Sequence, residues 1–125
     1  MYKSIISLMI ASPFVWGACG ASVPVPTQRM ADAESAERSA REVGANNEPA
    51  AQLSLKLADE QIAQAKTAIA NDDNEKADSL LVRARADAEL AIAQAREKNA
   101  RVAKQEAVTD SATQNKMNDS QGALK

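Results

Sequence analysis

Cys19 is the most distinctive reactive side chain in this sequence. It is the only cysteine among 125 residues, and it lies between Ala18 and Gly20, where an apolar N-terminal stretch gives way to small residues. The sequence contains no histidine, and its three aromatic residues all precede Cys19. A chain with one thiol and no imidazole lacks the usual pairing of nucleophile and base, the usual zinc ligands and any internal disulfide. We therefore expect a protein that is not an enzyme and that holds no metal ion or cofactor.

A short acidic cluster in the middle of the chain is a second candidate for chemistry. Asp72, Asp73 and Glu75 could hold a calcium ion, but the segment lacks the glycine and the ligand spacing of an EF-hand loop. The same residues stand directly before a predicted helix. Asp72 followed by Glu75 three residues later resembles a capping box, so we predict that the cluster caps this helix.

Asp87 and Glu89 are the only conceivable acid and base groups of an enzyme. They lie among Arg83 and Arg85 on a predicted long helix. Alternating charges on a helix surface are typical of a solvated face with ion pairs. We expect no catalytic role for either carboxylate and no small-molecule substrate.

The first 18 residues have the pattern of a secretory signal peptide. One basic residue, Lys3, precedes a mostly apolar stretch over residues 5–18, which is shorter than the roughly 20 residues that a membrane-spanning helix needs. Small residues at Gly17 and Ala18 stand directly before Cys19. This arrangement resembles the lipidation site of bacterial lipoproteins. The resemblance implies cleavage between Ala18 and Cys19 and attachment of fatty acids, such as palmitate, to Cys19.

The same resemblance implies a location at the membrane. A lipoprotein cysteine carries three acyl chains, and each buried methylene contributes about 0.8 kcal/mol to membrane binding. Gly20 stands where an Asp tends to retain such proteins at the inner membrane, which implies the outer membrane with the domain facing the periplasm. An ordinary secretory cut is the alternative, with Ala18 and Gly20 flanking Cys19, because Trp16 stands where lipoprotein signals usually carry Leu. That cut would leave a soluble periplasmic protein.

After Cys19 the sequence predicts a spacer and then a helix. Residues 19–27 contain Pro24 and Pro26, which favour an extended backbone. Apolar residues then recur every three or four positions over residues 28–43, which predicts a short helix. Gly44 follows it and can adopt the left-handed conformation that often ends a helix. The net charge of −2, with no basic block, makes nucleic acid an unexpected partner.

Two longer helices are expected over residues 50–70 and 74–107, joined by a short turn into an antiparallel hairpin. Their apolar positions alternate in steps of three and four, as in a coiled coil. These positions are Ala51, Leu55, Ala58, Ile62, Ala65 and Ile69 in the first helix, and Ala77, Leu81, Ala84, Ala88, Ala91, Ala95 and Val102 in the second. The expected fold is all-α, either a three-helix bundle or an elongated coiled-coil-like hairpin. Residues 108–125 lose the apolar period and are expected to form a disordered tail.

Alanine fills most of this predicted seam. Alanine favours helix formation but buries little surface, so a hairpin alone should be marginally stable. The helix over residues 28–43, or a second copy of the chain, is expected to supply the missing packing. Leu53 and Leu57 lie off the seam and could receive that helix or a partner protein.

Two parts of the sequence carry a family resemblance. One is Gly44-Ala45 followed by Glu48-Pro49 and Leu53, and the other runs from Asn71 to Leu81 and on through residues 85–91. Together with Cys19 and the proline spacer, they resemble the DUF4398 family of bacterial lipoproteins over about residues 19–104. The resemblance implies no assigned activity. Some family members are similar or fused to outer-membrane proteins with a peptidoglycan-binding domain of the OmpA type, which this sequence lacks.

These features predict a non-enzymatic structural or adaptor lipoprotein of the cell envelope. Its expected partners are the membrane, through the lipid on Cys19, and envelope or OmpA-like proteins or a second copy of the chain. Lys125 supports an alternative, because the murein lipoprotein joins peptidoglycan through a C-terminal lysine. In that case the protein would be a tether between membrane and cell wall.

Overall fold

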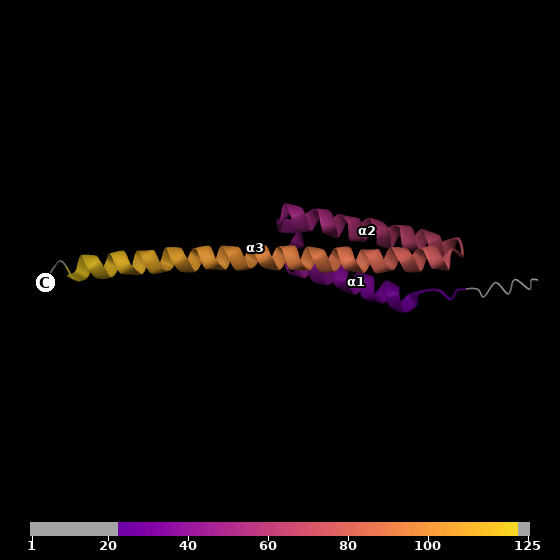
Figure 1. Cartoon of the computed structure of the whole chain (residues 1–125), viewed down its shortest axis with the longest axis horizontal. Coiled ribbons are helices and arrows are strands. Elements are labelled where there is room, and N and C mark those ends of the chain that lie inside the picture. Colours follow the sequence, from indigo (N-terminus) through magenta and orange to yellow (C-terminus); the bar gives the residue numbers. More distant parts are fainter. Residues whose placement is uncertain (1–22, 123–125) are drawn as a thin grey trace, which may run out of the picture.

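In the computed structural model, which describes residues 23–122, the chain forms three helices and a short 3₁₀ turn (Figure 1). The α1 helix spans Thr27–Glu42, the 3₁₀ turn η1 spans Ala45–Asn47, the α2 helix spans Pro49–Ala70, and the α3 helix spans Asn74–Gly122. No strand occurs within this range. The prediction of an all-α helical bundle is confirmed. The predicted peptide cleavage at Ala18 and lipid at Cys19 lie outside the described residues.

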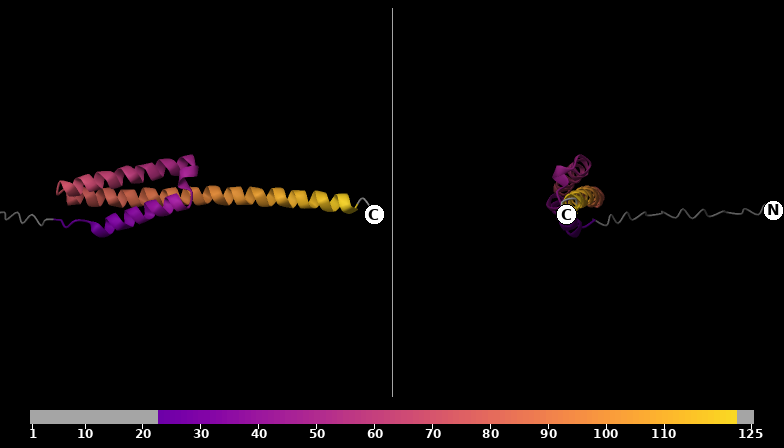
Figure 2. Two further views of the ribbon diagram at one scale, coloured as in Figure 1. Left: turned by 180° about the vertical axis from the view of Figure 1, so that it is seen from behind. Right: turned by 90° about the vertical axis from the view of Figure 1, so that its left-hand side faces the viewer.

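The helices run up, down and up along a single long axis (Figure 2). At one end, the Asn74 Nδ2 donates a hydrogen bond of 2.8 Å to the Val23 carbonyl, which holds the start of the described chain against the α2–α3 turn. At the other end of the bundle, the Asn99 Nδ2 donates a hydrogen bond of 3.1 Å to the Val43 carbonyl, just after α1. The α1 helix therefore runs parallel to α3, and α2 is antiparallel to both.

Backbone conformation at the two turns ends one helix and begins the next. Gly44 has a φ of 88°, in the left-handed region that glycine adopts without a Cβ clash, as predicted. Pro49 is the first residue of α2, where a missing N–H costs no hydrogen bond. The α2–α3 turn differs from the prediction, because Asp72 is left-handed with a φ of 59° and the Asp73 Oδ1 accepts a hydrogen bond of 3.3 Å from the Lys76 N–H. The cap is thus one residue later than the predicted capping box.

Alanine side chains dominate the core. In the described part of the chain, twelve of the sixteen buried apolar residues are alanines, and Leu81 is the largest side chain that is fully buried. The predicted seam is buried from Ala51 to Ala65 on α2 and from Ala77 to Ala95 on α3, which confirms the hairpin. Two seam residues are exceptions: Ile69 is half-buried, and Val102 has 42% of its surface exposed because it lies beyond the start of α2. Small facing residues allow the helices to approach closely.

The α1 helix completes the bundle by packing mainly on α3 and less on α2. Ala33 and Ala40 are its fully buried residues. Ion pairs join its surface to both neighbours: the Lys66 Nζ lies 2.8 Å from the Glu34 Oε1 on the α2 side, and Arg29 pairs with Asp78 on the α3 side. The expectation that the hairpin needs a third helix is met by α1 within the same chain.

The predicted disordered tail is wrong for the residues that the structure describes. The α3 helix does not end near residue 107 but continues to Gly122. All side chains over residues 100–121, here called the overhang, are exposed. The apolar period is therefore lost because no other helix packs on this segment. The helix itself continues. The segment has no proline, and no glycine before Gly122, so no residue in it forces the helix to stop.

Candidate functional surfaces

The residues predicted to carry covalent chemistry are at the two ends of the chain, outside the described range. The structure nevertheless fixes where the nearest described residues lie. Val23, four residues after Cys19, lies at the α2–α3 turn, and Gly122, three residues before Lys125, ends the overhang at the opposite extreme of the long axis (Figure 1). The contact between Asn74 and Val23 could not be predicted from sequence patterns, because the two residues are 51 positions apart.

The acidic cluster at the α2–α3 turn surrounds a hollow of about 380 Å³ next to Val23. Its carboxylates are those of Asp72, Asp73 and Glu75, of which Asp73 caps α3. Across residues 23–122, no group of three or more acidic, histidine or cysteine side chains is arranged to hold a metal ion. The hydrogen bond that Asp73 accepts from the Lys76 N–H shows that Asp73 caps α3, one residue later than the predicted cap.

Asp87 and Glu89, the two carboxylates considered above as acid and base groups, form hydrogen bonds with different partners. The Gln61 Nε2 donates a hydrogen bond of 2.6 Å to the Asp87 Oδ2, which links α2 to α3. Arg85 donates through its Nε to Glu89 over 2.8 Å on the surface of α3. Two residues apart on a helix, Asp87 and Glu89 point in different directions and do not converge on one point.

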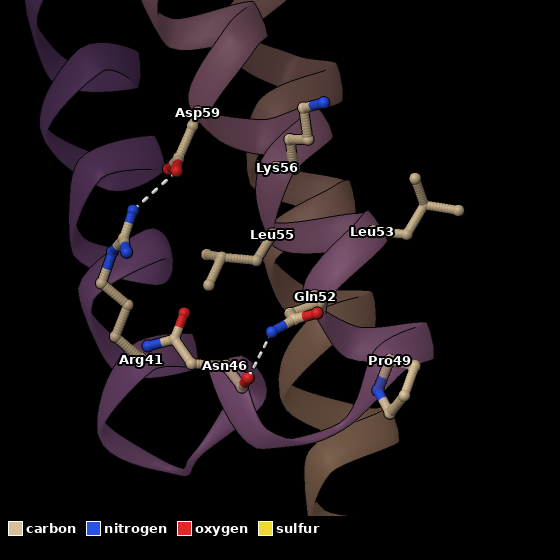
Figure 3. Close-up of a pocket in the computed structure, with 8 residues that line it drawn as sticks. All are labelled: Arg41, Asn46, Pro49, Gln52, Leu53, Leu55, Lys56 and Asp59. Carbon is tan, nitrogen blue, oxygen red and sulfur yellow. Dashed lines mark hydrogen bonds and ion pairs between the residues drawn. The ribbon is translucent and has the colours of Figure 1, made fainter.

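A hollow of about 390 Å³ lies beside the start of α2. Figure 3 shows the residues that line it. Across it, the Arg41 Nη2 of α1 lies 2.6 Å from the Asp59 Oδ2 of α2. The Gln52 Nε2 donates a hydrogen bond of 2.6 Å to the Asn46 carbonyl and so ties α2 to η1. The lining residues are Arg41, Asn46, Pro49, Gln52, Leu53, Leu55, Lys56 and Asp59.

The surroundings of this hollow have opposing effects on the pKa of Asp59. The pKa of Asp59 is raised: burial is the largest single cause, its hydrogen bond and attraction to Arg41 lower the pKa, and Glu37 raises it. The pKa of Arg41 is raised, chiefly by its hydrogen bond to Glu37 one turn earlier on α1. None of the lining residues is a serine, threonine, cysteine or histidine, so the hollow has no pairing of a nucleophile with an imidazole. Arg41 and Asp59 hold α1 and α2 together.

An exposed apolar face lies on the hairpin. Leu53, Leu57 and Leu90 expose 62%, 40% and 48% of their surfaces. Leu53 points away from the buried Leu55 (Figure 3). The first of the two predicted occupants, α1, does not cover this face, because its ion pairs and buried alanines meet the opposite side of the hairpin.

Comparison with known proteins identifies the family. A family model described as "Domain of unknown function (DUF4398)" matches residues 28–107, more than half of the chain. The chain belongs to the DUF4398 family. This confirms the predicted family. The match ends inside α3, so most of the overhang lies beyond the part that this DUF4398 protein shares with the family model.

No curated protein and no solved structure matches this DUF4398 protein. Between residues 23 and 122, none of its helices is both long enough and apolar enough to cross a membrane.

Proposed function

We propose that this DUF4398 protein is a lipid-anchored, periplasm-facing lipoprotein of the outer membrane and a non-enzymatic structural or adaptor component of the cell envelope. The observation that carries the proposal is the polarity of the fold. Val23 is held at the α2–α3 turn, and the α3 helix extends from that turn to Gly122. A lipid near one end and a long free helix toward the other suit a protein that presents a surface at a distance from its membrane.

Chain length limits how far the bundle can stand from the membrane. Val23 is four positions after Cys19, and an extended chain spans at most about 3.6 Å per residue, so Val23, at the α2–α3 turn, would lie within about 14 Å of the lipidated cysteine. The 49 residues of α3 extend about 73 Å at roughly 1.5 Å per residue. With α3 pointing away from the membrane, the overhang would reach well into the periplasm.

A structural role also suits the character of the described side chains. Three hollows near the helix ends are lined by charged side chains, amides and apolar groups. The polar residues in the bundle mostly join one helix to another, as Arg41 does with Asp59 and Gln61 with Asp87. These contacts rigidify a shape and supply no reacting group.

Metabolic labelling tests the anchor. Cells that produce the full chain are fed labelled palmitate, and their inner and outer membranes are separated. The proposal expects label on the wild-type protein in the outer membrane and none on Cys19→Ala, while Trp16→Leu serves as a control that keeps the cysteine and retains the label. An unlabelled wild-type protein would overturn the anchor. Loss of the protein without effect on envelope integrity, together with no crosslinked envelope partner, would overturn the structural or adaptor role.

A tether to peptidoglycan is the second candidate, and the position of Gly122 favours it. Gly122 ends α3 at the opposite extreme from Val23 and stands three residues before Lys125. Attachment through Lys125 would place the bond to the wall far from the lipid. Purified sacculi from cells producing wild type or Lys125→Ala are digested and the released peptides are weighed. A muropeptide on the wild-type C-terminus supports the tether, and its absence excludes it.

A further inference from the structure

Leu57 and Leu90 lie on one face of the hairpin, on the side away from α1, and Leu53 lies one helical turn before Leu57, between this face and the hollow that it lines with Arg41. On α2, the residues that pair with α1 are Asp59 and Lys66, and on α3 they include Asp78 and Arg85. These four residues lie on other sides of α2 and α3 than the exposed leucines. We call Leu53, Leu57 and Leu90 together the leucine face. The leucine face is thus left uncovered by the three-helix bundle.

Two hydrogen bonds fix the register of this face. The Ser54 Oγ donates to the Gln94 Oε1 over 3.0 Å, and the Gln61 Nε2 donates to the Asp87 Oδ2 over 2.6 Å. Leu57 lies between Ser54 and Gln61 on α2, three and four residues from them. On α3, Leu90 lies between Asp87 and Gln94 with the same spacing. Residues three and four apart share a helix face, so Leu57 and Leu90 lie side by side across the hairpin.

Opposite charges flank Leu90 at equal distances along α3. Arg83 and Glu97 lie seven residues before and after it, about two helical turns, so all three residues follow one stripe of the helix. Arg83 forms no ion pair with any described residue, and Glu97 has only a contact of 3.9 Å with Arg101 in its own helix. Both side chains are exposed. When two such stripes meet antiparallel with Leu90 against Leu90, each Arg83 faces the Glu97 of the other copy.

We propose that the leucine face binds a second copy of this chain in an antiparallel pair whose twofold axis passes beside Leu90. Such an interface is self-complementary, as a twofold dimer requires. It joins leucines to leucines at the centre and opposite charges at both ends. Ala86 and Ala93, on the outer side of α3 next to Leu90, allow the two helices to approach closely. This proposal goes beyond the envelope role and does not depend on the lipid.

Cysteine crosslinking tests the register. The full chain carrying Leu90→Cys is oxidised and compared with Val82→Cys and with the unsubstituted chain, which reports the contribution of Cys19. Leu90 and Val82 are matched, since each exposes 48% of its surface. In the antiparallel pair the two copies of residue 82 are offset by 16 residues, about 24 Å along the helices. Disulfides bridge Cα atoms only about 4.4–6.8 Å apart.

The proposal expects a disulfide-linked dimer of Leu90→Cys and no dimer of Val82→Cys above the unsubstituted background. Equal dimer yields at positions 82 and 90 would overturn it, because they would report random collision. No dimer at position 90, or a Leu90→Cys product that joins a different protein, would also overturn it.

Charge reversal tests the pairing itself. Sedimentation equilibrium measures dimerisation of the full chain with Arg83→Glu, Glu97→Arg and both changes together. We expect each single reversal to weaken the dimer by roughly tenfold, since it turns two exposed ion pairs into repulsions, and the double reversal to restore it. Circular dichroism checks that helix content is unchanged in these exposed variants. A double variant as weak as the single variants, or a monomeric wild type, would contradict the proposed arrangement.

Discussion

At the scale of single residues, Asp59 is subject to two opposing effects. Burial between α1 and α2 disfavours its charged form, and Arg41 at 2.6 Å favours it. Glu37 adds to the burial effect, because a second carboxylate beside Asp59 repels its charge and also forms a hydrogen bond with Arg41. The three side chains therefore form one coupled group at the junction of α1 and α2.

NMR titration of the Asp59 carboxyl carbon tests this coupling. We expect the pKa of Asp59 to lie above its ordinary value, to rise further in Arg41→Met, and to fall in Glu37→Gln. Because the folded-state pKa is above that of the unfolded chain, the associated stabilisation is present at low pH and is lost as pH rises through the folded-state pKa. The Asp59→Asn variant should lack this pH dependence. A pKa below the ordinary value would show that Arg41 outweighs burial.

At the scale of elements, the stability of the bundle depends strongly on its few large core residues, because alanine fills most of the seam. Among residues 23–122, Leu81 is the only large side chain that is fully buried, and it lies in one cluster with Ile62, Leu80 and Ala33. Removing its side chain leaves a cavity that small alanine neighbours cannot fill. We expect Leu81→Ala to lower the free energy of unfolding by about 2–5 kcal/mol.

Urea denaturation measures this loss, and the adjacent residue provides the control. Val82→Ala, on the exposed surface of the same helix, should change the free energy of unfolding by less than about 0.5 kcal/mol. Equal losses in Leu81→Ala and Val82→Ala would contradict the packing of α3 against α2.

The outer part of the overhang, residues 108–121, should exchange its amide hydrogens differently from the rest of α3. Residues 108–121 are exposed on all sides, and a helix that packs on nothing is held only by its local hydrogen bonds. In hydrogen exchange, their amides should exchange much faster than those of residues 77–95, which lie in the bundle. The antiparallel dimer proposed above leaves residues 108–121 uncovered as well. Equal protection along the whole of α3 would show that another surface covers the overhang.

The sequence predicted the bundle better than its ends. Spacings of three and four located the buried positions from Ala51 to Ala95, because burial of a helix face produces that period directly. The apolar period could not locate the end of α3, because a helix that packs on nothing does not need apolar residues at every third or fourth position. Long-range polar contacts such as Asn74 with Val23 and Arg41 with Asp59 also escaped prediction, because they depend on how distant helices are placed.

At the scale of the whole molecule, the fold is a rod with unlike ends. One end combines the α2–α3 turn with Val23, and the other is the single overhanging helix (Figure 2). An antiparallel pair would place the two α2–α3 turns at opposite ends of a longer rod. With a lipid on Cys19 of each copy, such a pair would lie along one membrane or join two membrane surfaces, whereas a single copy could project from one.

The central claim is that the mature DUF4398 protein begins at a lipidated Cys19, and the mass of its N-terminal peptide tests this most directly. The full chain is expressed in a bacterial host, extracted from membranes with detergent and digested, and the N-terminal peptide is weighed. We expect a peptide that begins at Cys19 and carries the added mass of a glycerol and fatty acids. An unmodified peptide that begins at Met1, or one that begins after Cys19, would contradict the lipid anchor.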